Sequence, residues 1–133
     1  MKDYRMAMLV LLWQEACLEH AVENDELLPG ALSATKAEEK VLDSVQAKEY
    51  PDLDWDDFNK AYSSFLDAKS RTEACLKILK ETSYEIKVQV VRYLFDMANA
   101  STEDNSEHSI SDAEASFILN VKQELGVSEE SII

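Results

Sequence analysis

The chain has 133 residues, of which 46% are apolar, and this length and composition predict one domain, residues 1–133, around a single hydrophobic core. Twenty-seven Asp and Glu against 13 Lys and Arg give a formal net charge of -14 at pH 7, so the average surface repels phosphate backbones and anionic lipid headgroups. Nucleic acid and membrane surfaces are therefore poor partners. Such acidity suits cations or the basic surface of a protein partner, although its commonest role is to keep a protein in solution.

The longest apolar run, MAMLVLLW from Met6 to Trp13, is too short to span a bilayer and lacks the cleavage site of a signal peptide. It predicts a buried core helix in a cytoplasmic protein without membrane insertion. The two cysteines, Cys17 and Cys75, each lie within an apolar helical pattern. We expect them to be buried free thiols, rather than a disulfide or metal ligands.

Two Gly and two Pro in the whole chain are too few for a β-sandwich or a glycine-rich phosphate loop, so the sequence predicts an all-α fold. The first helix is expected from Asp3 to about Val22. It is apolar almost all round, as is typical of a central helix. A narrow polar stripe is formed by Gln14, Glu15, Glu19 and Glu23.

Two further helices follow in the first half of the chain. One is expected from Thr35, with an apolar face formed by Ala37, Val41, Leu42 and Val45. The next follows YPDLD, and Asp54 is its expected N-cap. Its apolar face is expected to contain Trp55, Phe58, Tyr62, Phe65 and Leu66.

Three helices are expected in the second half. A Ser-x-x-Glu capping box predicts that one begins at Ser70. The segment 83–100 alternates like a strand at first and then repeats like a helix, and the absence of a partner strand favours a helix. The last begins at Ser111, with Glu114 completing its capping box, and stops at Gly126. The final SEESII can add one more turn.

The two halves of the chain follow the same order of elements. In each half an apolar helix is followed by an acidic loop, and a capping box then opens an amphipathic helix. We therefore expect a single-domain bundle of about seven helices with a pseudo-two-fold repeat of a helix, acidic loop, helix unit.

The second half resembles the TerB-like family, which includes a tellurite-resistance protein and the N-terminal domain of a co-chaperone. The resemblance is carried by Ala98, Ala100, Ile110, Glu114 and the LGV that starts at Leu125. These match parts of a family run, Ala-x-Ala-Asp-Gly-x-Ile-(Ser/Thr)-x-x-Glu, with a distal Leu-Gly. In the first half the matching residues are Ala21, Leu32, Ser33 and Glu38. The resemblance implies a helical fold and a non-enzymatic role in tellurite resistance or another stress response.

The loop before the last helix is a candidate metal site. With Glu114 as the twelfth position of an EF-hand-like loop, positions one, three, five and seven are Glu103, Asn105, Glu107 and Ser109. Their oxygen atoms suit a divalent cation such as Ca²⁺ or Mg²⁺. His108 occupies the sixth position, where such loops normally turn through glycine. The simpler alternative is that Glu114 caps the helix and the other acidic residues are solvated.

The sequence predicts no enzyme, because neither His20 nor His108 stands in a motif with a nucleophile. Two functions remain. The first is an interaction module that presents its acidic loops to a basic partner surface, with a cation ordering the loops. The second is a metal-binding or metal-sensing protein that uses the loop from Glu103 to Glu114.

Overall fold

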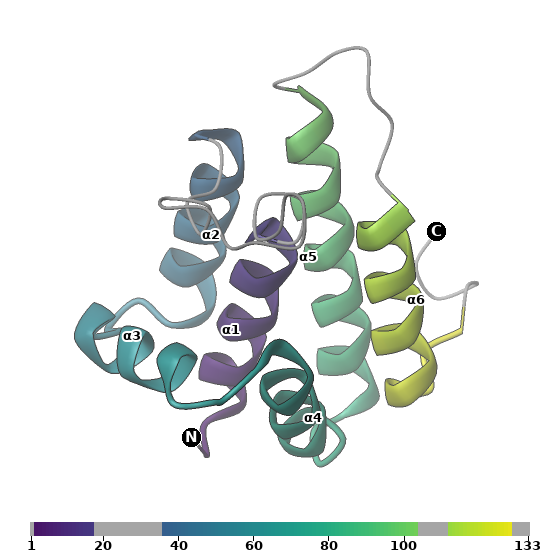
Figure 1. The fold of residues 1–133 in the computed structure, drawn as a ribbon, viewed down its shortest axis with the longest axis horizontal. Helices are drawn as coiled ribbons and strands as arrows, with labels where there is room; N and C mark the ends of the chain where they lie inside the picture. The colour runs from purple at the N-terminus through teal and green to yellow at the C-terminus, as the bar shows by residue number, and fades with distance from the viewer. Residues whose placement is uncertain (1, 18–35, 104–111, 129–133) are drawn as a thin grey trace.

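The computed structural model describes residues 2–17, 36–103 and 112–128, and within these ranges the chain forms a single bundle of six helices without a strand. The helices are α1 (Tyr4–Cys17), α2 (Lys36–Glu49), α3 (Trp55–Ser63), α4 (Ala68–Leu79), α5 (Tyr84–Glu103) and α6 (Asp112–Leu125) (Figure 1). The all-α prediction is confirmed. The additional turn expected in SEESII, like residues 18–22 of the expected first helix, lies outside the described residues, apart from Ser128, which is not helical.

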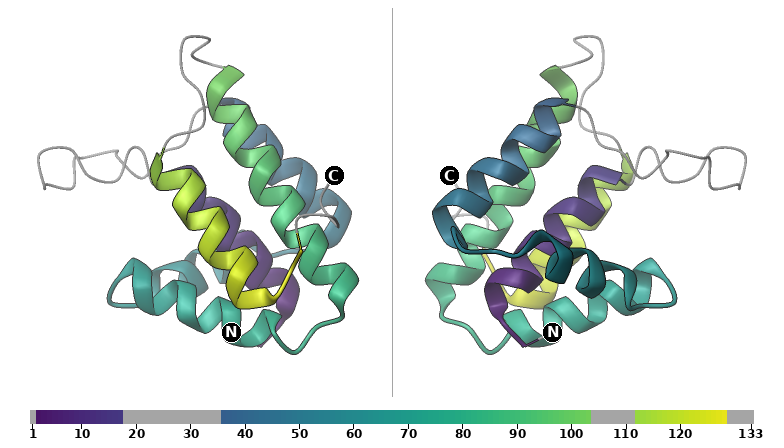
Figure 2. Two further views of the ribbon diagram at one scale, coloured as in Figure 1. Left: turned by 90° about the vertical axis from the view of Figure 1, so that its right-hand side faces the viewer. Right: turned by 90° about the vertical axis from the view of Figure 1, so that its left-hand side faces the viewer.

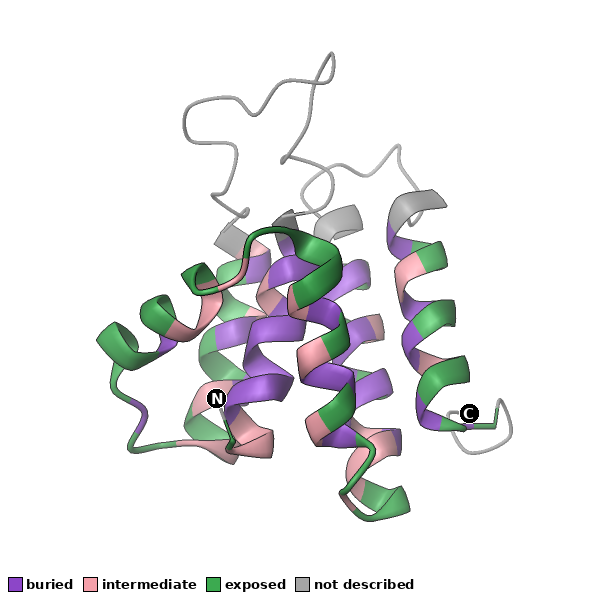
Figure 3. Cartoon of the chain, turned by 60° about the horizontal axis from the view of Figure 1, so that its bottom comes forward, coloured by how far each residue is buried: buried purple, intermediate pink, exposed green. Residues whose placement is uncertain are grey.

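Four helices, α1, α2, α5 and α6, run side by side, and α3 and α4 lie across one end of this group (Figures 1 and 2). Helix α1 is central, because it packs against α2, α3, α4 and α5. Every residue from Met6 to Leu12 is buried, and Ala7, Leu9, Val10, Leu11 and Leu12 are fully buried (Figure 3). An apolar run without a polar face is stable only when neighbours surround it, and α1 has them on all sides.

The cap at the start of α3 follows the prediction, whereas the cap at the start of α4 does not. The Asp54 carboxylate accepts a hydrogen bond from the Asp56 N–H at 2.8 Å, as an N-cap does. Helix α4 begins at Ala68 instead of at Ser70, because Asp67 is its N-cap and accepts from the Ser70 N–H at 2.7 Å. The predicted Ser70 cap was therefore wrong, and a carboxylate one turn earlier occupies the positive end of the helix dipole.

The predicted apolar face of α3 is also only partly correct. Phe58 is buried, but Trp55 is 39% exposed and Leu66 is fully exposed. The helix ends at Ser63, and the Ser64 hydroxyl donates to the Ala61 carbonyl oxygen at 2.8 Å. The helical spacing of apolar residues therefore continues in the sequence beyond the point where the helix itself stops.

The second half agrees more closely with expectation. The ambiguous segment 83–100 is helical from Tyr84 onwards, and α6 ends before Gly126, whose φ is +69°. Ile118, Val121 and Leu125 are buried, as their spacing on α6 predicts. None of the six helices in the described ranges has the length and apolar character needed to cross a bilayer.

Candidate functional site

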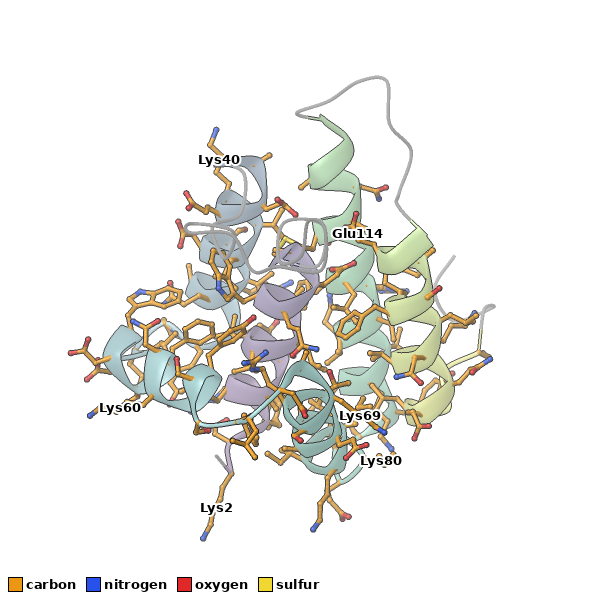
Figure 4. All side chains as sticks on the ribbon, in the orientation of Figure 1. Lys2, Lys40, Lys60, Lys69, Lys80 and Glu114 are labelled. Carbon is orange, nitrogen blue, oxygen red and sulfur yellow. The ribbon has the colours of Figure 1, made fainter. Side chains whose placement is uncertain are left out.

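Three glutamates are buried in the bundle although they are charged residues in water. Glu15 of α1 is 0% exposed, and Glu38 of α2 and Glu114 of α6 are each 1% exposed. Figure 4 shows Glu114 on the first turn of α6, on the side of that helix that faces the bundle. Acidic side chains are almost never fully buried unless they are paired, so three in one small bundle require an explanation.

The helices place these glutamates in two ways. Glu15 follows the apolar run of α1, so the helix that forms the core also carries this carboxyl group inward. Glu38 and Glu114 are each the third residue of their helix, which is the position of the glutamate in a capping box. The predicted cap residues, Thr35 and Ser111, lie outside the described residues.

The residue next to Glu15 shows how this fold satisfies a buried polar side chain. Gln14 is 4% exposed, donates from Nε2 to the Thr72 hydroxyl, and accepts from Arg71 Nη1 at 3.1 Å. The Arg71 guanidinium also donates to the Tyr62 carbonyl oxygen at 2.8 Å and stacks over the Tyr62 ring. Both the nitrogen and the oxygen of the Gln14 amide therefore have a hydrogen-bond partner on α4.

Glu15 has no such partners. Neither of its carboxylate oxygens has a hydrogen bond to any described residue, although both are shielded from water. Burial, and to a lesser extent the negative charges of Glu114 and Glu38, together raise the pKa of Glu15 to about 10. All three influences act in the same direction, so Glu15 by itself holds a proton at neutral pH.

This arrangement allows two chemical states. In one, Glu15 is a neutral acid, and in the other a cation balances the buried carboxylates. Within the described ranges no three Asp, Glu, His or Cys side chains are already grouped to hold one metal ion. An ion would therefore have to draw the glutamate side chains closer together, and oxygen-only ligands are those of Ca²⁺ and Mg²⁺.

The sequence-predicted metal site can be located only in part. Glu114 is buried, and Glu103 is the last residue of α5, but the structure does not describe the side chain of Glu103. Asn105, Glu107 and Ser109 lie outside the described residues, so the loop site stays a prediction.

Sequence reasoning did not select Glu15 and did not connect it to Glu38. One signal for Glu15 was present, because it lies two residues after an unbroken apolar run on a helix with no exposed side. For Glu38 the signal was the spacing of three residues after Thr35, the same spacing that separates Glu114 from Ser111. The spacing of residues does not show which buried polar side chains of α1 have hydrogen-bond partners.

The buried thiol of Cys75 is free, as predicted, and burial raises its pKa to about 12. A thiol with so high a pKa carries almost no thiolate at neutral pH and is a poor nucleophile or ligand. The side chain of Cys17 lies outside the described part of the chain.

No family model, no curated protein and no solved structure matches this chain. The likeness to TerB-like proteins therefore stays a prediction from a few residues of the second half.

Proposed function

We propose that this protein is a non-enzymatic interaction module whose helical bundle binds a divalent cation at the cluster of Glu15, Glu38 and Glu114. The observation that carries the proposal is the state of Glu15, which is fully buried with both carboxylate oxygens unpaired, and on which two further buried carboxylates act. A cation offsets the cost of burying Glu15, because it supplies charge and coordination to the two Glu15 carboxylate oxygens, which no described residue contacts by a hydrogen bond. Oxygen ligands favour Ca²⁺ or Mg²⁺ over Zn²⁺, which prefers nitrogen and sulfur.

The position of the cluster supports a control function for the ion. Its members come from α1, α2 and α6, so a cation bound by them links three helices that are distant in sequence. Binding energy at such a site is also folding energy, because the unfolded chain has no preformed cluster. A partner surface formed by several helices is then presented in one arrangement only when the ion is bound.

Two features support a repeat of TerB-like type. Glu38 and Glu114 occupy the same position in α2 and α6, each is preceded by alanine, and both are buried to the same degree. This supports the pseudo-two-fold repeat expected from the two halves. Glu114 is also the glutamate of the family run, and the proposed role in metal or tellurite stress rests on this resemblance alone.

The test is thermal unfolding after treatment with a chelator, followed by addition of Ca²⁺, Mg²⁺, Mn²⁺ or Zn²⁺ at pH 7.5. An ion at a hundred times its Kd stabilises a protein by about 2.7 kcal/mol. That is roughly a 10 °C rise in Tm for a domain of this size. We expect this shift with Ca²⁺ or Mg²⁺ in the wild type and its loss in Glu15→Gln, which keeps the shape of the side chain but removes the charge.

Glu73→Gln is the matched control, because Glu73 is an exposed glutamate of α4 and its loss changes the net charge equally. This variant should keep the full ion shift, and NaCl of matched ionic strength should not reproduce it. No shift with any divalent ion would contradict the proposal. A shift that survives Glu15→Gln but is lost in Glu107→Gln would instead assign the ion to the loop from Glu103 to Glu114.

A further inference from the structure

A pocket of about 370 Å³ lies where α1, α2 and α3 meet, and its described lining includes none of the three buried glutamates. Helix α3 packs on α1, and the pocket lies between α3 and α2. The pocket is lined by Trp13 from α1, by Glu39, Leu42 and Asp43 from α2, and by Trp55, Phe58 and Asn59 from α3.

Aromatic rings form much of the wall of this pocket. The chain has two tryptophans, and both line it. Trp55 is 39% exposed, and its ring meets the buried Phe58 ring edge to face at a centroid distance of 5.3 Å. An indole held in place by a buried ring while much of it stays open to water is typical of a binding surface, because its face is available to a ligand.

The rim of the pocket is acidic. Glu39 and Asp43 are exposed and lie four residues apart on α2, where two like charges are neighbours and repel each other. Neither carboxylate forms an ion pair within the described ranges, and no Lys or Arg is among the described lining residues. The acidic surface continues along the start of α3 through the exposed Asp56 and Asp57.

The lysines labelled in Figure 4 do not form ion pairs with the carboxylates at the rim of the pocket. Lys40 and Lys60 project away from the bundle, and Lys69 and Lys80 lie at α4, on a different part of the molecule (Figure 4). Lys80 forms its own ion pair with Glu124 at 3.0 Å. The corner of α1, α2 and α3 therefore combines aromatic faces with carboxylates that form no ion pair within the described ranges.

We propose that this pocket receives an arginine side chain from a basic segment of a partner protein. The guanidinium stacks on an indole face and pairs with Glu39 or Asp43, while its aliphatic stem contacts Leu42. The carboxylates of Asp56 and Asp57, beyond the pocket, provide sites for further basic residues of the same segment, which a small ammonium ligand could not reach. This proposal rests on the proposed function only in assuming a protein partner with a basic surface. It does not require a cation at Glu15.

Tryptophan fluorescence gives a direct readout, because both tryptophans of the chain line the pocket. The probe is the capped peptide acetyl-Gly-Arg-Arg-Gly-Arg-Arg-Gly-amide, titrated at constant ionic strength in chelator and again in Ca²⁺. We expect a saturable change in emission, and affinity at least about tenfold weaker for the double variant Glu39→Gln, Asp43→Asn. Trp55→Ala should weaken binding similarly in calorimetry, and circular dichroism verifies that each variant is folded.

The matched control is the double variant Glu73→Gln, Glu81→Gln, which removes two exposed charges from the α4 side of the molecule. Equal weakening by both double variants would overturn the proposal, because it would assign binding to net charge alone. A saturable response to tetramethylammonium without one to the peptide would also overturn it in favour of a small-molecule site. The two proposals fail separately, because peptide binding is lost by changes at Glu39 and Asp43, whereas the ion-induced Tm shift is lost by a change at Glu15.

Discussion

Gln14 and Glu15 are neighbours on α1, and both are buried, but they differ in their hydrogen-bond partners. Arg71 and Thr72 meet the amide of Gln14, whereas no described residue meets the carboxyl group of Glu15. A buried hydrogen bond contributes about 1 kcal/mol, but a buried polar group left without a partner costs more than that. The site is therefore defined by a single side chain that the surrounding helices leave unsatisfied.

This state of Glu15 makes the stability of the ion-free protein depend on pH. Its folded pKa of about 10 lies above the ordinary value of 4.5, so the folded state holds a proton that the unfolded state releases. The associated stability is complete below pH 4.5, declines as pH rises, and is fully lost once the pH passes the folded pKa. The slope is at most about 1.4 kcal/mol per pH unit.

We therefore expect the free energy of unfolding of the wild type in chelator to fall between pH 5 and pH 8 relative to that of Glu15→Gln. Urea unfolding at each pH measures the difference. Parallel pH profiles for the two proteins would show that Glu15 ionises normally in the folded state. Glu73→Gln should track the wild type across this range.

Removing the Thr72 hydroxyl tests how much its hydrogen bond with Gln14 contributes to stability. Thr72→Val keeps the volume of the side chain but removes the acceptor for Gln14 Nε2 and the donor to the Ala68 carbonyl oxygen. We expect a loss of about 1 to 3 kcal/mol in urea unfolding, because a buried amide group is left without its partner. Thr82→Val removes a hydroxyl that donates only to the Leu79 carbonyl oxygen near the end of α4, and it should cost less. Equal effects of the two substitutions would contradict this account.

At the scale of the element, the end of α6 has the geometry of a Schellman cap. The Gly126 N–H donates to the Gln123 carbonyl oxygen at 3.2 Å and the Val127 N–H to the Lys122 carbonyl oxygen at 3.0 Å. Gly126 has a φ of +69°, and a Cβ added there would meet no atom within 4 Å. The cost of a side chain at this position is therefore one of backbone conformation alone.

Gly126→Ala is expected to destabilise the protein by about 1 kcal/mol. Gly126→Asn should cost less, because asparagine adopts the left-handed conformation more readily. Thermal unfolding of the two variants measures the difference, and an alanine variant as stable as the wild type would mean that α6 ends differently in solution.

The sequence predicts the ends of a helix well where only one or two residue types suit the backbone conformation at that position. Gly126 marks the end of α6 because few other residues adopt its φ, and Asp54 marks the start of α3. The start of α4 was missed because Asp67 and Ser70 are both good cap residues three positions apart, and only packing decides between them. The end of α3 was missed for a similar reason, since apolar spacing continues through Leu66 after the helix has ended.

At the scale of the whole molecule, the low Gly and Pro content predicted an all-α fold, and the apolar run of the first helix predicted its central position. The candidate site was not predictable to the same extent, because its members are separated by more than 70 residues between Glu38 and Glu114 and meet only through packing. The pocket at α1, α2 and α3 depends in the same way on where three helices cross. The spacing of apolar residues predicts which face of a single helix is buried. It does not predict where neighbouring helices leave a pocket between them.

The central position of α1 also affects how the protein is made. Ribosomes produce α1 before any of the helices that cover it, and α5 is completed about 90 residues after Trp13. At usual rates of translation this interval is on the order of ten seconds. Until α5 is complete, α1 lacks one of the helices that cover it in the folded protein, so we expect the nascent chain to bind chaperones that recognise apolar segments. Slower folding of the second half would extend this exposure, so we expect substitutions in α4 and α5, as well as in α1, to lower the yield of folded protein in cells.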